Sequence, residues 1–188
     1  MSEILVEQVD DPPMPPKKGK GDDDSKKPID PKNLPKGYVL DKDGKPCRTC
    51  NSLLDFRKAK GLTGAAALMK PVPKDCPPDV NEIGRSTWTF LHSVAATYPE
   101  TASAEQQKDM KSFIRIFGNI YPCWFCASDF REYVAKPANE PKVATQEEFG
   151  RWLCDAHNDV NKKLGKPVFD CNLWKERWRD GWKDGRCD

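Results

Sequence analysis

The chain has 188 residues, a formal net charge of +2 and 37% hydrophobic residues, a size that suits one ordinary domain and a tail. A charge this close to zero gives no argument for nucleic acid as a partner, and no stretch approaches the about 18 apolar residues of a membrane span. Eight cysteines, six of them in paired spacings, favour a compartment where disulfides persist.

The N-terminal part of the chain has the composition of a disordered segment. Eight of the 17 prolines precede Cys47, and segment 1–35 carries six lysines against eight acidic residues. Such a segment buries too little apolar surface to offset the entropy that ordering costs. Its start shows neither a secretory signal nor an arginine-rich transit peptide. The predicted divisions are a disordered tail (1–46), a cysteine pair with a flexible linker (47–75) and a folded body (76–188).

The body begins with two predicted helices. The first starts at Pro78 or Asp79 and ends at Tyr98, which precedes a proline. The second starts after Thr101 or Ser103, because Ser103 followed three residues later by glutamine is typical of a capping box. Each segment carries apolar residues along one helical face, so both are expected to pack against a common core.

Two more helices and a short fifth follow. The third is predicted from Pro122 to about Val134, with the proline in its first turn. The fourth opens at Thr145 and is capped by Gly165. Tryptophans at four-residue spacing predict a short fifth helix over 172–183. No segment alternates as a strand does, so the predicted fold is all-α, a four-helix bundle plus a short fifth helix.

Cys123 and Cys126 form a CxxC pair at the start of the third predicted helix. The partial positive charge of a helix N-terminus favours a thiolate, and the spacing permits a disulfide, so the pair is predicted to be redox-active. Cys123, nearer the helix start, is expected to be the more exposed member. The alternative is half of a zinc site, but Cys47 and Cys50 lie about 70 residues away, farther than a zinc ribbon requires.

The other cysteines suggest three further roles. A disulfide between Cys47 and Cys50 would close too small a loop to stabilise the fold much, so this pair is predicted to be a mobile dithiol shuttle. Its linker to the body, if flexible, would span about 30 Å. Cys154 and Cys171 are predicted to be a structural disulfide. Cys76 and Cys187, at the two ends of the body, permit pairing within the chain or across a dimer.

Dithiol oxidation requires an electron acceptor, which protein side chains do not supply. The sequence has no GxGxxG after a strand, and a Rossmann cofactor site is therefore not expected. Trp88 and His92 share a helix face, and the fourth helix carries His157, Asn158, Asn161 and Lys163. Aromatic faces, amides and cations of this kind suit a dinucleotide between helices. The alternative is that the tryptophan and histidine are ordinary core residues.

Three motifs in order resemble the Erv/ALR family of FAD-linked sulfhydryl oxidases. They are Gly84-Arg85-Ser-Thr-Trp88-Thr-Phe-Leu-His92, Tyr121-Pro-Cys-x-x-Cys126 and Cys154-x-x-His157-Asn158-x-Val-Asn161-x-Lys163-Leu-x-Lys166-Pro-x-Phe-Asp-Cys171. The resemblance covers 76–188, and the segments around Cys76 and Cys187 are similar to the animal branch in its long mitochondrial form. It implies that residues 76–188 form a helix bundle that binds FAD and that the protein is a homodimer.

The resemblance also implies an activity. A thiol oxidase would generate disulfides in partner proteins, passing electrons from Cys47/Cys50 to Cys123/Cys126, to FAD, and on to oxygen or cytochrome c. Its catalytic residues would then be these four cysteines, and its site would contain no metal. Its protein substrate would be a dithiol, such as a disulfide carrier of the mitochondrial intermembrane space, where this protein would also work.

The same resemblance implies which residues line the cofactor and which cysteines are structural. The FAD-lining residues would be Arg85, Trp88, His92, Cys154, His157, Asn158, Val160, Asn161, Lys163, Lys166, Arg177 and Trp178. Cys154–Cys171 would be a structural disulfide, and Cys76 would pair with Cys187 of the other subunit. Two readings from other classes are a zinc-binding interaction module and a non-enzymatic helical factor stapled by disulfides.

Overall fold

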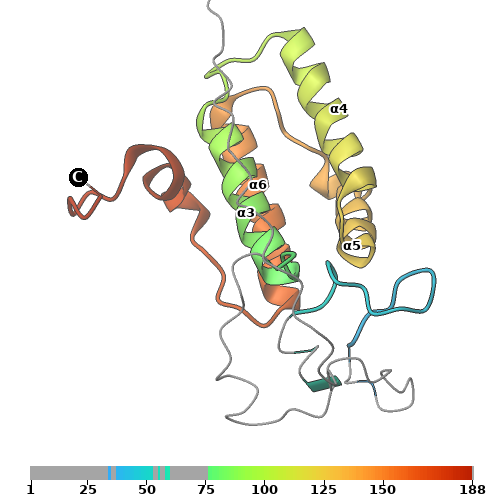
Figure 1. Cartoon of the computed structure of the whole chain (residues 1–188). Helices are drawn as coiled ribbons and strands as arrows, with labels where there is room; N and C mark the ends of the chain where they lie inside the picture. The colour runs from blue at the N-terminus through green and yellow to red at the C-terminus, as the bar shows by residue number, and fades with distance from the viewer. Residues whose placement is uncertain (1–33, 35–36, 53–54, 56–57, 60–75, 188) are drawn as a thin grey trace, which may run out of the picture.

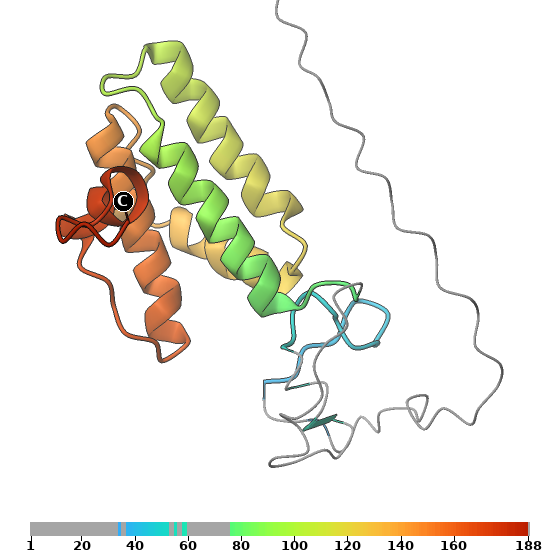
Figure 2. The same cartoon turned by 60° about the vertical axis from the view of Figure 1, so that its left-hand side comes forward.

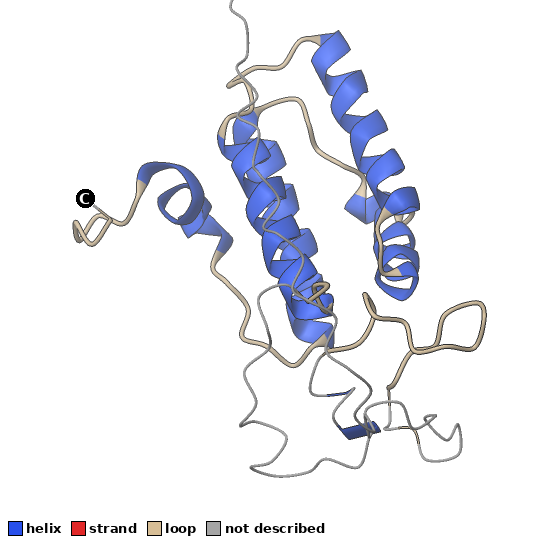
Figure 3. Cartoon of the chain, in the orientation of Figure 1, coloured by secondary structure: helices blue, strands red, loops and turns tan. Residues whose placement is uncertain are grey.

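The computed structural model describes residues 34, 37–52, 55, 58–59 and 76–187, and the predicted disorder of 1–33 lies outside these residues. Four α-helices form the body: α3 (Val80–Ala96), α4 (Ala104–Ile120), α5 (Trp124–Val134) and α6 (Gln146–Lys163). Helix α3 packs against α6 and α4 against α5 (Figure 1). The described ranges contain helices and loops but no strand (Figure 3), which confirms the all-α prediction.

Local sequence signals set the starts of α3, α4 and α6. The Asp79 side chain accepts hydrogen bonds from two amides of the first turn of α3. Ser103 and Gln106 form the predicted capping box at α4, each side chain bonded to the backbone amide of the other residue. The Thr145 hydroxyl accepts from the Glu148 amide at α6. Gly165, directly after the helix, has the positive φ of 66° that glycine tolerates best.

Helix α5 begins later than predicted. Cys123 is its N-cap, with an extended backbone (ψ 99°) and a sulfur that accepts from the Cys126 amide at 3.2 Å. Pro122 therefore lies before the cap and not in the first turn. The predicted end at Val134 is confirmed. Cys123 and Cys126 consequently bracket the positive end of α5.

The fifth helix is shorter than predicted. After α6 the chain makes a 3₁₀ turn, Cys171–Leu173, and one π-helical turn, Glu176–Asp180. Gly181 follows with φ 81°, a conformation that ends the helix before Trp182. The 3₁₀ turn contacts α6, whereas the π-helical turn, in red in Figure 2, contacts α3.

The core joins all four helices. It contains Leu91 and Ala95 from α3, Ile114 from α4, Tyr133 from α5, and Phe149, Trp152 and Leu153 from α6. Trp174, 1% exposed, packs its ring over Gly150 of α6. This contact fixes the position of the C-terminal turn that follows it. Within the described ranges, no helix has the length and apolar character needed to cross a membrane.

Residues 37–52, which we call the arm, have a defined conformation. The Asp41 carboxylate accepts from two amides of its own turn, and Leu40 pairs with Pro46 in a β-bridge. Cys47 and Cys50 are joined by a disulfide. Residues 37–46 thus form a turn where we predicted part of the disordered tail, because the aspartate supplies local hydrogen bonds that composition does not reveal. The predicted linker after the arm falls largely on 60–75, outside the described residues.

Candidate active site

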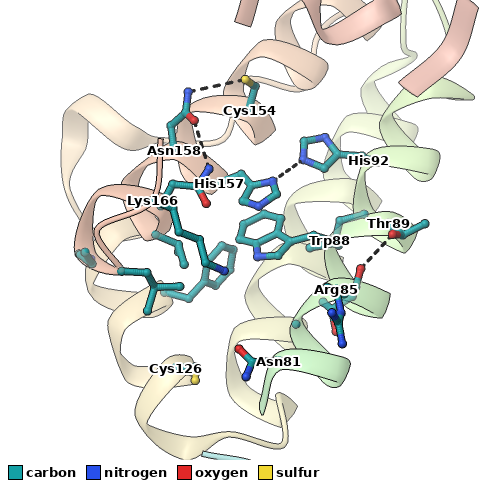
Figure 4. Close-up of a pocket in the computed structure, with 18 of the residues that line it drawn as sticks. Asn81, Arg85, Trp88, Thr89, His92, Cys126, Cys154, His157, Asn158 and Lys166 are labelled. Carbon is teal, nitrogen blue, oxygen red and sulfur yellow. Dashed lines mark hydrogen bonds between the residues drawn. The ribbon is translucent and has the colours of Figure 1, made fainter. Parts of the chain in front are cut away.

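A cavity of about 850 Å³ lies between α3, α5, α6 and the segments that follow α6. Figure 4 shows Cys126 at one end of this cavity and Cys154 with Asn158 at the other. Twelve residues that we predicted to bind FAD line it: Arg85, Trp88, His92, Cys154, His157, Asn158, Val160, Asn161, Lys163, Lys166, Arg177 and Trp178. Residues up to 93 positions apart in the chain therefore meet at one place.

Aromatic rings form the middle of the cavity. Trp88 stacks on His157 with ring centroids 4.1 Å apart, and His92 stacks on Trp178 at 4.3 Å. The rings come from α3, α6 and the C-terminal turn. Parallel rings of this kind present flat apolar faces, the surface on which a planar heteroaromatic ring stacks well.

His92, which is buried, and His157, which is half-buried, form a neutral pair. His92 Nε2 lies 3.0 Å from His157 Nδ1. Burial, followed by the neighbouring His157 and Arg177 charges, lowers the pKa of His92 to about 3. Burial, together with Lys166 and Arg177, lowers the pKa of His157 to about 4. His92 Nδ1 is buried and has no hydrogen-bond partner among the described residues, so a polar group of a ligand would satisfy it.

This pair should make the fold sensitive to acid. Between pH 6.5 and about 4 the unfolded chain binds protons that the folded histidines do not, so stability falls as pH drops through this window. For His92, which is 2% exposed, the loss is at most about 1.4 kcal/mol per pH unit. We expect the urea midpoint of the wild-type protein to fall more steeply between pH 7 and 5 than that of His92→Gln. Parallel pH profiles of the two proteins would contradict the assignment.

The cations around the cavity divide into two groups. In the described part of the chain, Arg85, Lys166 and Arg177 make no ion pair, and the Arg177 guanidinium lies 4.1 Å from the Trp178 ring centroid. Lys163 instead bonds Asp129 at 2.7 Å and Asp159 at 2.6 Å. Burial opposes its charge, but these carboxylates outweigh that effect and raise the pKa of Lys163. The first group is free to meet phosphates, whereas Lys163 joins α5 to α6.

Asn158 is already hydrogen-bonded to the chain that closes the cavity. Its Oδ1 accepts from the Phe169 amide at 2.9 Å and its Nδ2 donates to the Phe169 carbonyl at 2.8 Å. The Cys154–Cys171 disulfide lies beside these bonds. Asn158 therefore lines the cavity as predicted, but its amide positions the Phe169 loop and is not available to a ligand in this arrangement.

Cys123 and Cys126 are joined by a disulfide at the N-terminus of α5. Cys126 is half-buried and lines the cavity, whereas Cys123 is 0% exposed and does not. Our expectation that Cys123 is the more exposed member was wrong, because the helix start lies against other parts of the chain. The sulfurs of both CxxC pairs are in disulfides, so they are not the thiolates that zinc requires.

Several lining residues were missed from the sequence. They are Val80, Asn81, Gly84, Thr87, Thr89, Leu91, Phe117, Tyr121, Phe125, Asp129, Phe130, Leu164 and Phe169. Phe117 contacts Phe130 edge-on and Tyr121 at a tilt, as core aromatic residues do. Their helical spacing indicated only a buried face, and nothing in it distinguishes a cavity wall from a packed core.

The cavity suits FAD in size and chemistry. Drug-sized ligands occupy pockets of about 300–1,000 Å³, lined by apolar groups with a few polar ones. Here aromatic faces meet a disulfide sulfur at one end, unpaired cations suit a pyrophosphate, and the buried His92 nitrogen awaits a partner. A metal site has no comparable support, since the described residues contain no cluster of three or more His, Cys, Asp or Glu side chains.

Comparison with known proteins agrees with this chemistry. The model of the Erv1 / Alr family matches residues 85–179. Mitochondrial FAD-linked sulfhydryl oxidase ERV1 of Saccharomyces cerevisiae is 48% identical over 163 residues, which cover 74% of this chain and 85% of the relative. The Schizosaccharomyces pombe protein of the same description is 40% identical, covering 75% of this chain and 90% of the relative.

Solved structures give the same result for the body. The crystal structure of the FAD binding domain of Erv1 from Saccharomyces cerevisiae is 55% identical, with a TM-score of 0.54. The match covers 57% of this chain and all of that domain. Sequence and fold therefore agree on the segment that contains the cavity and the Cys123–Cys126 disulfide. This chain belongs to the Erv1/Alr family.

Proposed function

We propose that this chain is an FAD-linked sulfhydryl oxidase that generates disulfides in dithiol proteins. The observation that carries the proposal is Cys126, half of a disulfide at a helix N-terminus, in the wall of an aromatic and cationic cavity. The relatives named above bear this activity in their descriptions. Bound FAD would accept two electrons from the Cys123–Cys126 dithiol and release them to oxygen or cytochrome c.

The residues of the cavity divide the work of holding the cofactor. Trp88, His92, His157 and Trp178 supply flat faces, and the buried His92 nitrogen supplies one polar contact. Arg85, Lys166 and Arg177 would meet the phosphates, and Phe169, held by Asn158, forms part of the cavity wall. In this proposal Lys163 is a positioning residue and does not contact phosphate.

The cysteines carry out ordinary thiol–disulfide exchange. A partner thiolate attacks the Cys47–Cys50 disulfide, forms a mixed disulfide, and a second partner thiolate resolves it, leaving an oxidised partner and a reduced arm. The arm dithiol reduces Cys123–Cys126 by the same two attacks. Each step forms one S–S bond and breaks another, and the two protons lost by the attacking thiols are taken up by the thiolates that leave. The N-terminus of α5 favours the thiolate that leaves when the Cys123–Cys126 disulfide is attacked.

A visible absorption spectrum of the purified protein tests the proposal. We expect flavin bands that bleach on addition of dithiothreitol, since a dithiol next to FAD would reduce it. The bands should recover in air, because reduced flavin would pass its electrons to oxygen. A colourless folded protein that was never stripped of ligand would refute the flavin assignment, and bound zinc in that protein would favour the interaction module instead.

The proposal extends to the compartment and the partner. The two fungal relatives are described as mitochondrial, and we place this protein in the intermembrane space, with a disulfide carrier of that space as substrate. We also propose that a second copy of the chain binds to exposed apolar residues. Phe90 of α3 and Ile116 and Ile120 of α4 are exposed, and burying them would stabilise a homodimer.

A disulfide between subunits is also expected. Cys76 and Cys187 are free and exposed within one chain, so each is accessible to a second copy. We predict a dimer on a gel without reductant and a monomer after reduction, and the variant Cys187→Ser should run as a monomer in both lanes. A wild-type protein that runs as a monomer without reductant would exclude this disulfide. Sedimentation of the native protein would then show whether a non-covalent dimer forms.

A further inference from the structure

The arm (residues 37–52) is folded around one buried amide. Asn51 is 2% exposed, and its Oδ1 accepts from the Val39 amide at 2.8 Å. Its Nδ2 donates to the Val39 carbonyl at 2.7 Å and to the Cys47 carbonyl at 2.8 Å. The amide thus ties the start of the arm to its disulfide, so the arm holds Cys47 and Cys50 in a fixed frame.

The arm is attached to the start of α3. The Val80 amide, in the first turn of α3, donates to the Asn51 carbonyl at 3.3 Å. The Arg48 guanidinium donates to the Pro77 carbonyl at 2.7 Å. These bonds join residues about 29 positions apart and place the arm at the end of the bundle where α5 also begins.

The arm also bonds both neighbours of Cys123. The Thr49 hydroxyl donates to the Pro122 carbonyl at 2.8 Å, and the Trp124 indole Nε1–H donates to the Leu40 carbonyl at 3.1 Å. In Figures 1 and 2 the arm, in blue and cyan, lies across the lower end of the bundle near the start of α5. Residues on each side of the active cysteine are therefore in direct contact with the arm.

The burial of Cys123 is consistent with this cover. An N-cap at the end of a bundle would ordinarily meet solvent, yet Cys123 is 0% exposed, while Trp124 beside it is 52% exposed. Moreover, the Cys47 sulfur lies 3.6 Å from the Thr49 hydroxyl that bonds Pro122. One side chain therefore links the arm disulfide to the residue that precedes the active disulfide.

We propose that Thr49 and Trp124 are positioning residues that hold the arm over Cys123 and so slow direct attack on the active disulfide. The inference rests on the proposed function for its catalytic meaning, but the cover itself is independent of FAD. In the seated state an arm thiolate attacks the Cys123 sulfur and Cys126 leaves as a thiolate. The second arm thiolate then restores Cys47–Cys50 and releases Cys123. A thiol without access to the arm must wait until the arm lifts.

The test measures direct access to the active disulfide in the full-length chain. In a Cys47→Ser/Cys50→Ser background, tris(2-carboxyethyl)phosphine reduces Cys123–Cys126 without relay through the arm. Maleimide labelling at intervals, followed by peptide mass spectrometry, then measures the thiols of Cys123 and Cys126 separately from those of the other cysteines. Adding Thr49→Val or Trp124→Phe should speed this reduction about fivefold, the factor expected when one hydrogen bond of typical net strength is lost.

A matched control and a second readout make the test decisive. The control is Thr97→Val, which removes a hydroxyl that donates to the Ser93 carbonyl. Thr97 lies at the end of α3 away from the arm, so the reduction rate of this variant should match that of the parent protein. In the chain with its arm disulfide intact, the Trp124 indole proton should exchange with solvent slowly, and faster in Thr49→Val. Equal reduction rates in parent and variants, or equal indole exchange, would overturn the proposal. Neither assay needs flavin, so failure of the oxidase assignment would appear separately, in the absorption spectrum.

Discussion

Cys126→Ser should lose turnover by about a thousandfold or more while retaining bound flavin, because removal of one member of a catalytic unit disables the whole unit. Cys126 stands in the cavity wall, and two electrons can leave the pair only as a disulfide forms between its sulfurs. Cys123→Ser should have the same effect for the same reason. Oxygen consumption with dithiothreitol gives the rate, and the visible spectrum gives the flavin content.

A third cysteine provides the control for this experiment. Cys76→Ser removes an exposed thiol that is unpaired within the chain, and it should retain wild-type turnover with the small dithiol. Full activity in either Cys123→Ser or Cys126→Ser would show that another pair carries the electrons. Loss of flavin in Cys126→Ser would instead mean that the Cys126 sulfur is needed to bind the cofactor. The lost turnover would then give no support for a redox role of Cys126.

Gly150→Ala should destabilise the protein and weaken flavin binding. An added Cβ at Gly150 would lie 2.6–2.7 Å from three atoms of the buried Trp174 ring, so the ring has to move. Overpacking of this kind costs about 1–3 kcal/mol. For a chain of this size we expect the melting temperature to fall by roughly 2–12 °C. The displaced ring precedes Arg177 and Trp178, so flavin content per chain should fall as well.

The same substitution at a second helical glycine should act in the opposite direction. An added Cβ at Gly84 of α3 meets nothing within 4 Å, so Gly84→Ala is expected to stabilise flavin-free protein by about 0.5–1 kcal/mol. Thermal unfolding of both variants after removal of flavin separates packing from cofactor effects. A Gly150→Ala protein that melts at the wild-type temperature would show that Trp174 does not fix the C-terminal turn.

Much of the fold could be predicted from the sequence because helix ends depend on near neighbours. The Ser103–Gln106 box and the Thr145 cap are bonds across three residues, and Gly165 ends α6 through its own backbone angle. The resemblance to a family also selected the residues that line the cavity. The prediction was wrong where a cap competed with a proline: Cys123, and not Pro122, sets the start of α5.

What the sequence determined is therefore the all-α class and most helix ends, and its resemblance to a family indicated twelve of the residues that line the cavity. Only the tertiary structure decided which groups are free to act. His92 reaches His157 across 65 residues, Lys163 is neutralised by Asp129 across 34, and Thr49 reaches Pro122 across 73. Such contacts depend on how separate elements pack, which local propensity does not encode. The burial of Cys123 follows from that packing and could not be read from its position in a CxxC motif.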